Sequence, residues 1–362
     1  MKIFKKILCL IFASALLIPL FSMPAFAEDN AESSAGSDAG KISSMLVYGD
    51  SLATGYRLEN YSRFDNSGPA DSFPNLLCKN YALEYDKNFF NYAKTGEDST
   101  KTLAAVKNTS PELIKNADVI IISTGGNDVM DIVELALYQI FVDEKDNLEK
   151  IGIEVDLSSL DTIEKTIISA FSNPKAKSSI DRMIKKCSDI TVQNSFSDTV
   201  LLYEANVKEM ISFIRETGSE AEIFFITPYD PTSMLSGNAI IESINKMLTD
   251  ISNKTLDLIQ TKEYGYKLHA EDLLNEFRDN LIVWTNIITF DIHPNKDGHR
   301  HIYEMLVRDI SSAVSAKEEA VMALAEKNAP YSNTVVYILF GAACVCVTVI
   351  VIHTVLTHRR KS

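Results

Sequence analysis

The sequence predicts an α/β protein, a three-layer α/β/α sandwich built on a mostly parallel five-stranded sheet. Short apolar runs at residues 45–48, 119–122 and 223–226 have the length and composition of strands that are buried on both faces. Segments in which apolar residues recur at helical spacing separate these runs. Strands that alternate with helices in this way form a parallel sheet with helices on both of its faces.

The expected elements can be given in chain order. We expect the five strands at residues 45–48, 88–92, 118–123, 222–227 and 266–268. We expect helices at residues 72–82, 100–106 and 238–258, and a further helix that begins at Ser197, whose hydroxyl is suited to cap a first turn.

Residues 130–194 are mostly helical in character and are interrupted by Pro174, so we expect a helical insertion at one edge of the body. An insertion of this kind serves either as a lid over a site or as additional packing. Of these two roles we favour additional packing.

The N-terminus has the three parts of an export signal. Three lysines precede an apolar stretch over residues 7–21, and residues 25–27, Ala-Phe-Ala, fit the small-x-small cleavage pattern. We therefore expect residues 1–27 to be a signal peptide. Residues 28–42, which are rich in small and acidic side chains, are expected to form a flexible leader.

The C-terminus carries a second membrane signal. Residues 334–356 contain no Asp, Glu, Lys or Arg, and at about 1.5 Å per residue they are long enough to span a bilayer as a transmembrane helix. A charged helical stalk over residues 315–333 precedes this span, and a basic tail over residues 357–362 follows it. Positive residues favour the cytoplasmic side, so we expect a single-pass protein of the cell membrane with its body outside.

A cell-wall sorting signal is the alternative interpretation of the same C-terminal pattern. Residues 329–333, Ala-Pro-Tyr-Ser-Asn, resemble a sortase pentapeptide only loosely, so we favour a retained anchor in the cytoplasmic membrane.

Charge excludes one large class of partner. The two ends contribute three positive charges each, so the formal net charge of −14 leaves −20 for residues 28–333. A body this acidic repels polyanions, and we expect no nucleic-acid partner. The cysteines do not determine whether the body contains a disulfide. Cys78 and Cys187 can form a disulfide outside the membrane or remain two thiols.

Four short segments bring together polar residues and glycines at positions where a ligand site is expected. Residues 49–51 (Gly-Asp-Ser), 91–96 (Asn-Tyr-Ala-Lys-Thr-Gly) and 125–128 (Gly-Gly-Asn-Asp) each lie at the end of a predicted strand. Residues 290–295 (Phe-Asp-Ile-His-Pro-Asn) come late in the chain. The carboxyl ends of parallel strands share one edge of a sheet, and ligands bind at that edge.

The residue types in these segments fit acyl transfer. Ser51 is the candidate nucleophile, and because a neutral serine is unreactive it needs a base, for which His293 is the best candidate. Asp291 can accept a hydrogen bond from the other imidazole nitrogen and so orient His293. The side-chain amide of Asn127 and the backbone N–H groups of Gly96 and Ser51 are candidate donors to an oxyanion.

Two neighbouring features complete this interpretation of the site. Residues 125–126, Gly-Gly, indicate a close approach of the backbone to a ligand. The sequence has no Cys/His spacing typical of a metal site and no glycine-rich phosphate loop, so we expect the chemistry to need neither a metal nor a cofactor.

In these four blocks and their order, the chain resembles the SGNH hydrolases, also called the GDSL family, which are named for a serine, a glycine, an asparagine and a histidine. The resemblance covers residues 45–310 apart from the insertion. It implies a flavodoxin-like SGNH fold, with a hydrolase domain over residues 43–314. It also implies the family roles for Ser51, Gly96, Asn127 and His293.

The histidine block departs from the family pattern. Many members place the acid three residues before the histidine, whereas here Asp291 precedes His293 by two and Phe290 stands at the usual place. Either Asp291 serves through a tighter turn or a backbone carbonyl orients His293, and we favour Asp291. His299 and His301 are competing candidates for the base, although we expect packing roles for both.

The sequence therefore predicts an extracytoplasmic serine esterase that hydrolyses carboxylic esters through an acyl-serine intermediate. The resemblance allows lipids, thioesters and acetylated glycans as substrates, and the acidic body favours a neutral or cell-wall glycan ester. The alternative function is a non-catalytic surface module that keeps this scaffold for binding.

Overall fold

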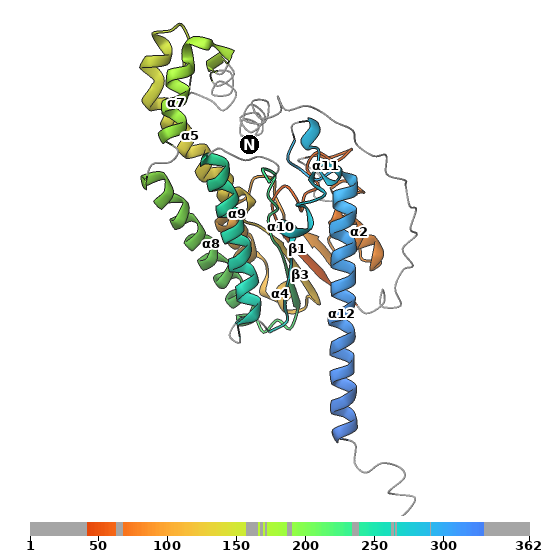
Figure 1. Cartoon of the computed structure of the whole chain (residues 1–362). Helices are drawn as coiled ribbons and strands as arrows, with labels where there is room; N and C mark the ends of the chain where they lie inside the picture. The colour runs from red at the N-terminus through yellow and green to blue at the C-terminus, as the bar shows by residue number, and fades with distance from the viewer. Residues whose placement is uncertain are drawn as a thin grey trace, which may run out of the picture. The chain divides into compact units, whose positions relative to one another are not determined.

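The computed structural model describes residues 42–328 except 63–67, 157–165, 167–168, 171, 187–189, 234–238, 262–263, 265 and 290. Its centre is a sheet of five parallel strands in the order β2-β1-β3-β4-β5, which Figure 1 shows in cartoon form. The strands are β1 (Met45–Gly49), β2 (Phe89–Asn91), β3 (Val119–Ser123), β4 (Glu222–Ile226) and β5 (Leu268–Glu271). The predicted five-stranded parallel sheet is confirmed.

The three central strands consist of the apolar runs seen in the sequence. Every residue of β1, β3 and β4 is buried, as expected for strands that are covered on both faces. Their last residues are neighbours across the sheet, because Ser123 pairs with both Gly49 and Ile226. This register places the segments that follow the three strands side by side at one edge.

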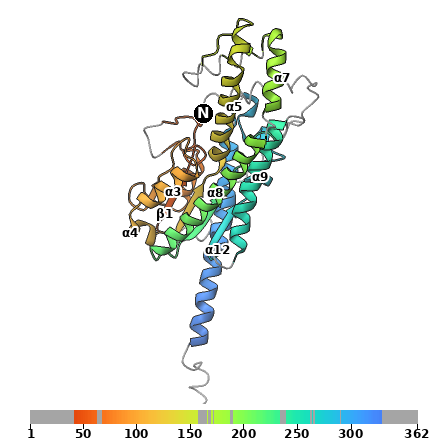
Figure 2. The ribbon, with the colours of Figure 1, turned by 90° about the vertical axis from the view of Figure 1, so that its left-hand side faces the viewer.

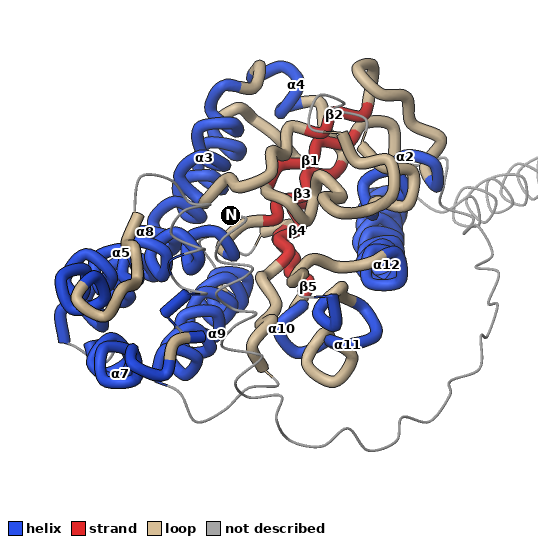
Figure 3. Tube along the Cα trace, turned by 90° about the horizontal axis from the view of Figure 1, so that it is seen from above, coloured by secondary structure: helices blue, strands red, loops and turns tan. Residues whose placement is uncertain are grey.

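Helices cover both faces of this sheet. The longer ones are α2 (Phe73–Asn80), α3 (Ser99–Asn108), α5 (Gly126–Glu149), α7 (Lys177–Lys186), α8 (Ile190–Glu216), α9 (Ala239–Gln260) and α12 (Lys296–Asn328). The short ones are α4 (Pro111–Lys115), α10 (Leu273–Glu276), α11 (Leu281–Trp284) and the 3₁₀ turns η1 (Pro174–Ala176) and η2 (Ile287–Thr289). Seen from above, α3, α8 and α9 lie on one side of the strands and α2 on the other (Figure 3). Helices α8 and α9 lie side by side (Figure 2).

The chain divides into two compact units between Ser311 and Ser312, inside α12. The first unit holds the sheet, and the part of α12 that belongs to it buries Ile302, Leu306 and Ile310. Of the second unit, the structure describes only the helical residues 312–328.

Two expected boundaries are wrong. Helix α8 runs without a break from Ile190, so Ser197 lies inside a helix and does not cap one. Strand β5 begins at Leu268 because Lys267 takes φ +50° and turns the chain just before it. Arg215 fixes this turn by donating to the Tyr266 carbonyl at 2.9 Å and to the Lys267 carbonyl at 3.1 Å.

Several expectations about the ends of the chain lie outside the described residues. These are the signal peptide, most of the leader, the end of the stalk, the span at 334–356 and the basic tail. Within the described ranges, no helix combines the length and the apolar character that crossing a membrane requires. Cys78 is a buried free thiol, and Cys187 is also outside the described residues.

Candidate active site

Ser51 lies just beyond the carboxyl end of β1. Gly49 makes this turn possible, because it takes φ +143° and a Cβ there would lie 2.2 Å from the Ser123 carbonyl oxygen. The chain then winds back on itself, and the Tyr56 N–H donates to the Ser51 carbonyl at 3.1 Å. The Ser51 side chain is therefore held at the sheet edge in a defined direction.

The structure brings Ser51, His293 and Asp291 together, although Ser51 and His293 are 242 positions apart in the chain. His293 Nε2 lies 2.9 Å from Ser51 Oγ, and His293 Nδ1 lies 2.6 Å from Asp291 Oδ1. An ionised carboxylate can only accept, so Nδ1 carries the proton and Nε2 is left to accept from the Ser51 hydroxyl. This is the arrangement that allows an imidazole to remove a proton from serine.

A tight turn brings Asp291 within hydrogen-bond distance of the His293 ring despite the short Asp-x-His spacing. Asp291 Oδ1 also accepts the backbone N–H of His293 at 3.2 Å, so a single oxygen holds both N–H groups of the same residue. Asn286 closes the loop behind this turn: its N–H donates to the His293 carbonyl at 2.9 Å, and its carbonyl accepts from the Asp291 N–H at 3.1 Å. Asp291 thus reaches Nδ1 across the shorter spacing.

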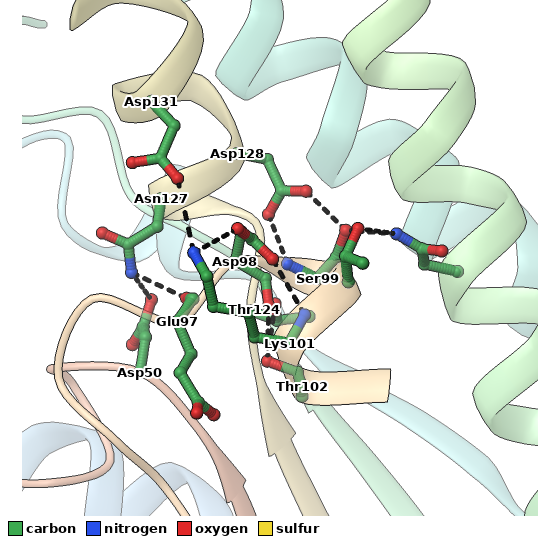
Figure 4. Close-up of polar contacts among 12 residues, drawn as sticks. Asp50, Glu97, Asp98, Ser99, Lys101, Thr102, Thr124, Asn127, Asp128 and Asp131 are labelled. Carbon is green, nitrogen blue, oxygen red and sulfur yellow. Dashed lines mark hydrogen bonds and ion pairs between the residues drawn. The ribbon is translucent and has the colours of Figure 1, made fainter. Parts of the chain in front are cut away.

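Gly96 and Asn127 line the same cavity as Ser51. Gly96 takes φ +90° in the loop after β2, and Asn127 is the second residue of α5, whose N-terminus favours negative charge. Asn127 Nδ2 donates to the Glu97 carbonyl at 2.8 Å and to Asp50 Oδ2 at 3.2 Å, as Figure 4 shows. Both amide hydrogens of Asn127 therefore have acceptors within the protein.

The two glycines Gly125 and Gly126 have different surroundings. A Cβ on Gly125, which takes φ +110°, would lie 2.9 Å from Ile251 and 3.0 Å from the Tyr203 ring, so its close approach is the packing of α5 on α8 and α9. Gly126 lines the cavity beside Ser51, which fits the close approach to a ligand expected from the sequence.

The cavity in front of Ser51 has a volume of about 210 Å³, and both polar and apolar side chains line it. The polar side chains include those of Asp50, Ser51, Ser123, Thr124, Asn127 and His293. The apolar side chains include those of Met130, Ile226, Pro228, Tyr229, Leu248 and Ile292. In the part of the chain that the structure describes, no group of three or more His, Cys, Asp or Glu side chains is arranged to hold a metal ion.

Two buried carboxyl groups support the loops of the site. Asp50 Oδ1 accepts the Leu52 N–H at 3.0 Å, and burial raises the pKa of Asp50 to about 7. Asp128 accepts both the N–H of Ser99, at 2.9 Å, and its hydroxyl (Figure 4), and burial raises the pKa of Asp128 to about 6. These contacts tie the turn after β1 and the start of α3 to the site.

We expect Asp50→Asn to remove part of the pH dependence of stability. The Asp50 pKa is about 7 in the folded protein, against a usual value of 3.8, so the folded state keeps a proton that the unfolded state releases between these values. Wild-type stability therefore falls as the pH rises from about 4 to 7, by on the order of 4 kcal/mol from this group. Asparagine does not titrate. Urea unfolding should therefore show that the free energy of unfolding of the variant rises relative to that of the wild type as the pH increases from 4 to 7. A difference that stays constant from pH 4 to 7 would contradict the raised pKa.

The two competing candidates for the base, His299 and His301, have other contacts. His299 is buried, stacks on Phe73 and accepts the Phe73 N–H at 3.4 Å, and burial lowers its pKa to about 3. His301 Nε2 lies 3.1 Å from Glu276, and the His301 ring stacks on Trp284. Both lie on α12 with partners of their own, so they do not compete with His293 for Ser51.

Two residues near His293 were not identified from the sequence. The Tyr56 ring meets the His293 ring edge-on, with 4.8 Å between the ring centroids. Arg57 Nε lies 2.9 Å from Asp291 Oδ2, on the side away from the imidazole. Both residues lie in an irregular turn after Ser51, where the sequence has no periodic pattern that could have indicated them.

The chain is similar to several known proteins. The uncharacterized protein YpmR of Bacillus subtilis (strain 168) is 22% identical over 229 residues, which are 63% of this chain and 68% of YpmR. Among solved structures, the lipase Lip_vut3 from a goat rumen metagenome is 18% identical with a TM-score of 0.46, and the match covers 74% of this chain and 96% of that one. Phospholipase A1 from Streptomyces albidoflavus NA297 is 16% identical with a TM-score of 0.47, over 74% and 99% of the two chains. Residues 47–301, which contain all the site residues described above, match the GDSL-like Lipase/Acylhydrolase family, and the chain belongs to this family.

Proposed function

We propose that this GDSL-family ester hydrolase cleaves carboxylic esters through an acyl intermediate on Ser51. The observation that carries the proposal is the hydrogen-bonded series from Ser51 Oγ through His293 to Asp291, at 2.9 Å and 2.6 Å, on the wall of a cavity. His293 Nε2 takes the serine proton as Oγ attacks the ester carbonyl, and then gives it to the leaving alcohol. Water, activated by the same imidazole, releases the acid and restores Ser51.

Asn127, with the backbone N–H groups of Gly96 and Ser51, is proposed to stabilise the oxyanion. Asn127 Nδ2 then has to exchange its 3.2 Å contact with Asp50 for the substrate oxygen, while the shorter contact with the Glu97 carbonyl keeps the amide in place. A single donor of this kind typically contributes about 10²–10³ in rate.

The lining of the cavity supports a particular class of substrate. Its apolar side chains, among them Met130, Tyr229 and Leu248, fit an acyl chain, and the acidic body disfavours an anionic ester. We therefore propose a neutral ester with an apolar acyl group, in a lipid or on a glycan.

The sequence patterns at the two ends support an extracytoplasmic, membrane-anchored enzyme. In this proposal residues 1–27 direct export, residues 334–356 anchor the chain in the cell membrane, and the hydrolase domain at 43–314 lies outside. Attachment to the cell wall after cleavage near residues 329–333 is the alternative.

A panel of p-nitrophenyl esters from acetate to octanoate, offered to the full chain in detergent, tests the activity. We expect turnover of at least one ester, with the highest kcat/KM for an acyl chain longer than acetyl, because many of the side chains that line the cavity are apolar. A chain that turns over no ester of any length is a non-catalytic module, and the proposed function is then wrong.

Asp291→Asn is expected to lower kcat by about 10⁴-fold at neutral pH. An asparagine amide can donate to Nδ1, which moves the imidazole proton to Nε2 and leaves no acceptor for the Ser51 hydroxyl. The measurement is kcat for the best ester in the panel. Activity within a few fold of the wild type would show that Asp291 is not the orienting acid.

A further inference from the structure

We propose that Arg57 is a positioning residue that fixes the orienting carboxylate of Asp291 and so makes the short Asp-x-His spacing workable. This inference rests on the proposed function, because it assigns Arg57 a role through His293 and Ser51. Arg57 itself is not one of the residues that line the cavity in front of Ser51.

The two carboxylate oxygens of Asp291 contact different residues. Oδ1 accepts both N–H groups of His293, at 2.6 Å from the ring nitrogen and 3.2 Å from the backbone. Oδ2 lies 2.9 Å from Arg57 Nε. A carboxylate held at one oxygen only can rotate about its Cβ–Cγ bond, whereas contacts at both oxygens fix its plane and the direction of Oδ1.

The backbone at Arg57 shows that this placement is maintained against a local preference. Arg57 takes φ +77°, a left-handed conformation that glycine or asparagine adopts far more readily than a long side chain. Neighbouring contacts hold the turn, from the Tyr56 N–H to the Ser51 carbonyl and from the Leu58 N–H to the Gly55 carbonyl, both at 3.1 Å. A strained backbone next to a reactive residue is typical of functional sites.

Tyr56 contacts both the arginine and the imidazole. The guanidinium carbon of Arg57 lies 5.2 Å from the centre of the Tyr56 ring, and that ring meets His293 edge-on. The turn that begins at the nucleophile therefore carries two consecutive side chains against the base and its acid.

The simpler explanation is that the Arg57–Asp291 ion pair only stabilises the fold. The solvent exposure of the two side chains distinguishes this explanation from a role in positioning Asp291. The Arg57 side chain is 47% exposed and the Asp291 side chain 13%. Ion pairs with a partner this exposed contribute little to the stability of a fold. Loss of Arg57 should therefore leave stability almost unchanged while it changes catalysis.

The charge of Arg57 also has a defined effect on the base. A positive charge beyond Asp291 opposes protonation of His293, so its removal should move the acid limb of the kcat/KM profile to higher pH. Removal of the Asp291 charge should move the same limb to lower pH. The other titratable groups around His293 are Tyr56, Tyr229, His299 and Asp50, which are common to all the variants compared.

The test compares Arg57→Gln, Arg57→Lys, Asp291→Asn and the double variant Arg57→Gln/Asp291→Asn in the full chain, over pH 5–9. We expect Arg57→Gln to lower kcat about 10- to 100-fold with KM nearly unchanged, and to shift the acid limb upward. Lysine restores the charge without the planar fork, so it should recover the pH profile and only part of kcat. In the Asp291→Asn background, Arg57→Gln should have almost no further effect, because its route to His293 is already lost.

Arg182→Gln is the matched control. Arg182 is also 47% exposed and also pairs with a carboxylate, Glu144, but in the helical insertion. Its loss should leave kcat and the pH profile unchanged. This inference is wrong if Arg57→Gln leaves both kcat and the pH profile unchanged. It is also wrong if Arg57→Gln lowers kcat as strongly in the Asp291→Asn background as in the wild type. Neither result affects the proposed function, which depends on Ser51-dependent turnover by the wild type. A wild type without any esterase activity would overturn the proposed function and this inference with it.

Discussion

The Ser51→Ala variant is expected to hydrolyse esters about 10⁴–10⁶-fold more slowly than the wild type at saturating substrate. Without Oγ no acyl intermediate can form, and only the oxyanion donors and the bound geometry remain to assist direct attack by water. KM should change little, because the apolar side chains that line the cavity are unchanged. Initial rates of p-nitrophenyl ester hydrolysis at several substrate concentrations measure both quantities.

Ser243→Ala is the control for Ser51→Ala. Ser243 lies on α9, does not line the cavity, and at 9% is as exposed as Ser51. Its replacement should leave kcat unchanged. If Ser51→Ala keeps more than about a hundredth of the wild-type kcat, Ser51 is not the nucleophile.

His293→Ala is expected to lower kcat by a similar factor, about 10⁴–10⁶-fold, because a neutral serine without a base is a poor nucleophile at pH 7. The 2.9 Å contact from Nε2 to Ser51 Oγ is the route by which the proton leaves. Residues that act as one unit are strongly non-additive. The double variant Ser51→Ala/His293→Ala should therefore be no slower than either single variant, as measured by kcat on the same ester.

His301→Ala serves as the comparison for His293→Ala, because His301 pairs with Glu276 and stacks on Trp284, outside the cavity lining. It should keep the wild-type kcat. Single-variant losses at Ser51 and His293 that multiply in the double variant would show that the two side chains act independently, against the proposed mechanism.

The fold could be predicted from the sequence because its strongest signals are local. Strands β1, β3 and β4 are continuous apolar runs buried on both faces, and parallel pairing requires helices between them. The sheet edge then follows from topology, which is why the sequence alone predicts that Ser51 and Asn127 lie just beyond the ends of strands. The boundary of β5 was less predictable, because Arg215 and the left-handed Lys267 set it.

The remaining features of the site depend on contacts between distant parts of the chain. The pairing of Arg57 with Asp291 joins two loops, and neither loop has a periodic pattern. The choice of Asp291 as the partner of Nδ1 depends on a turn in which one carboxylate oxygen accepts from both the backbone and the ring of His293. The contacts of Asn127 with Asp50 and Glu97 are likewise set by how α5 packs beside the loops after β1 and β2.

Covalent labelling at Ser51 tests the central claim most directly. The full chain is incubated with an aryl phosphonate ester, which forms a stable adduct with an activated serine, and the labelled residue is identified by peptide mass spectrometry. We predict a single adduct on Ser51, formed in step with the loss of ester hydrolysis, much slower in His293→Ala and absent from Ser51→Ala. Ester hydrolysis that persists without an adduct on Ser51, or an adduct on a different residue that accounts for the lost activity, would contradict the account.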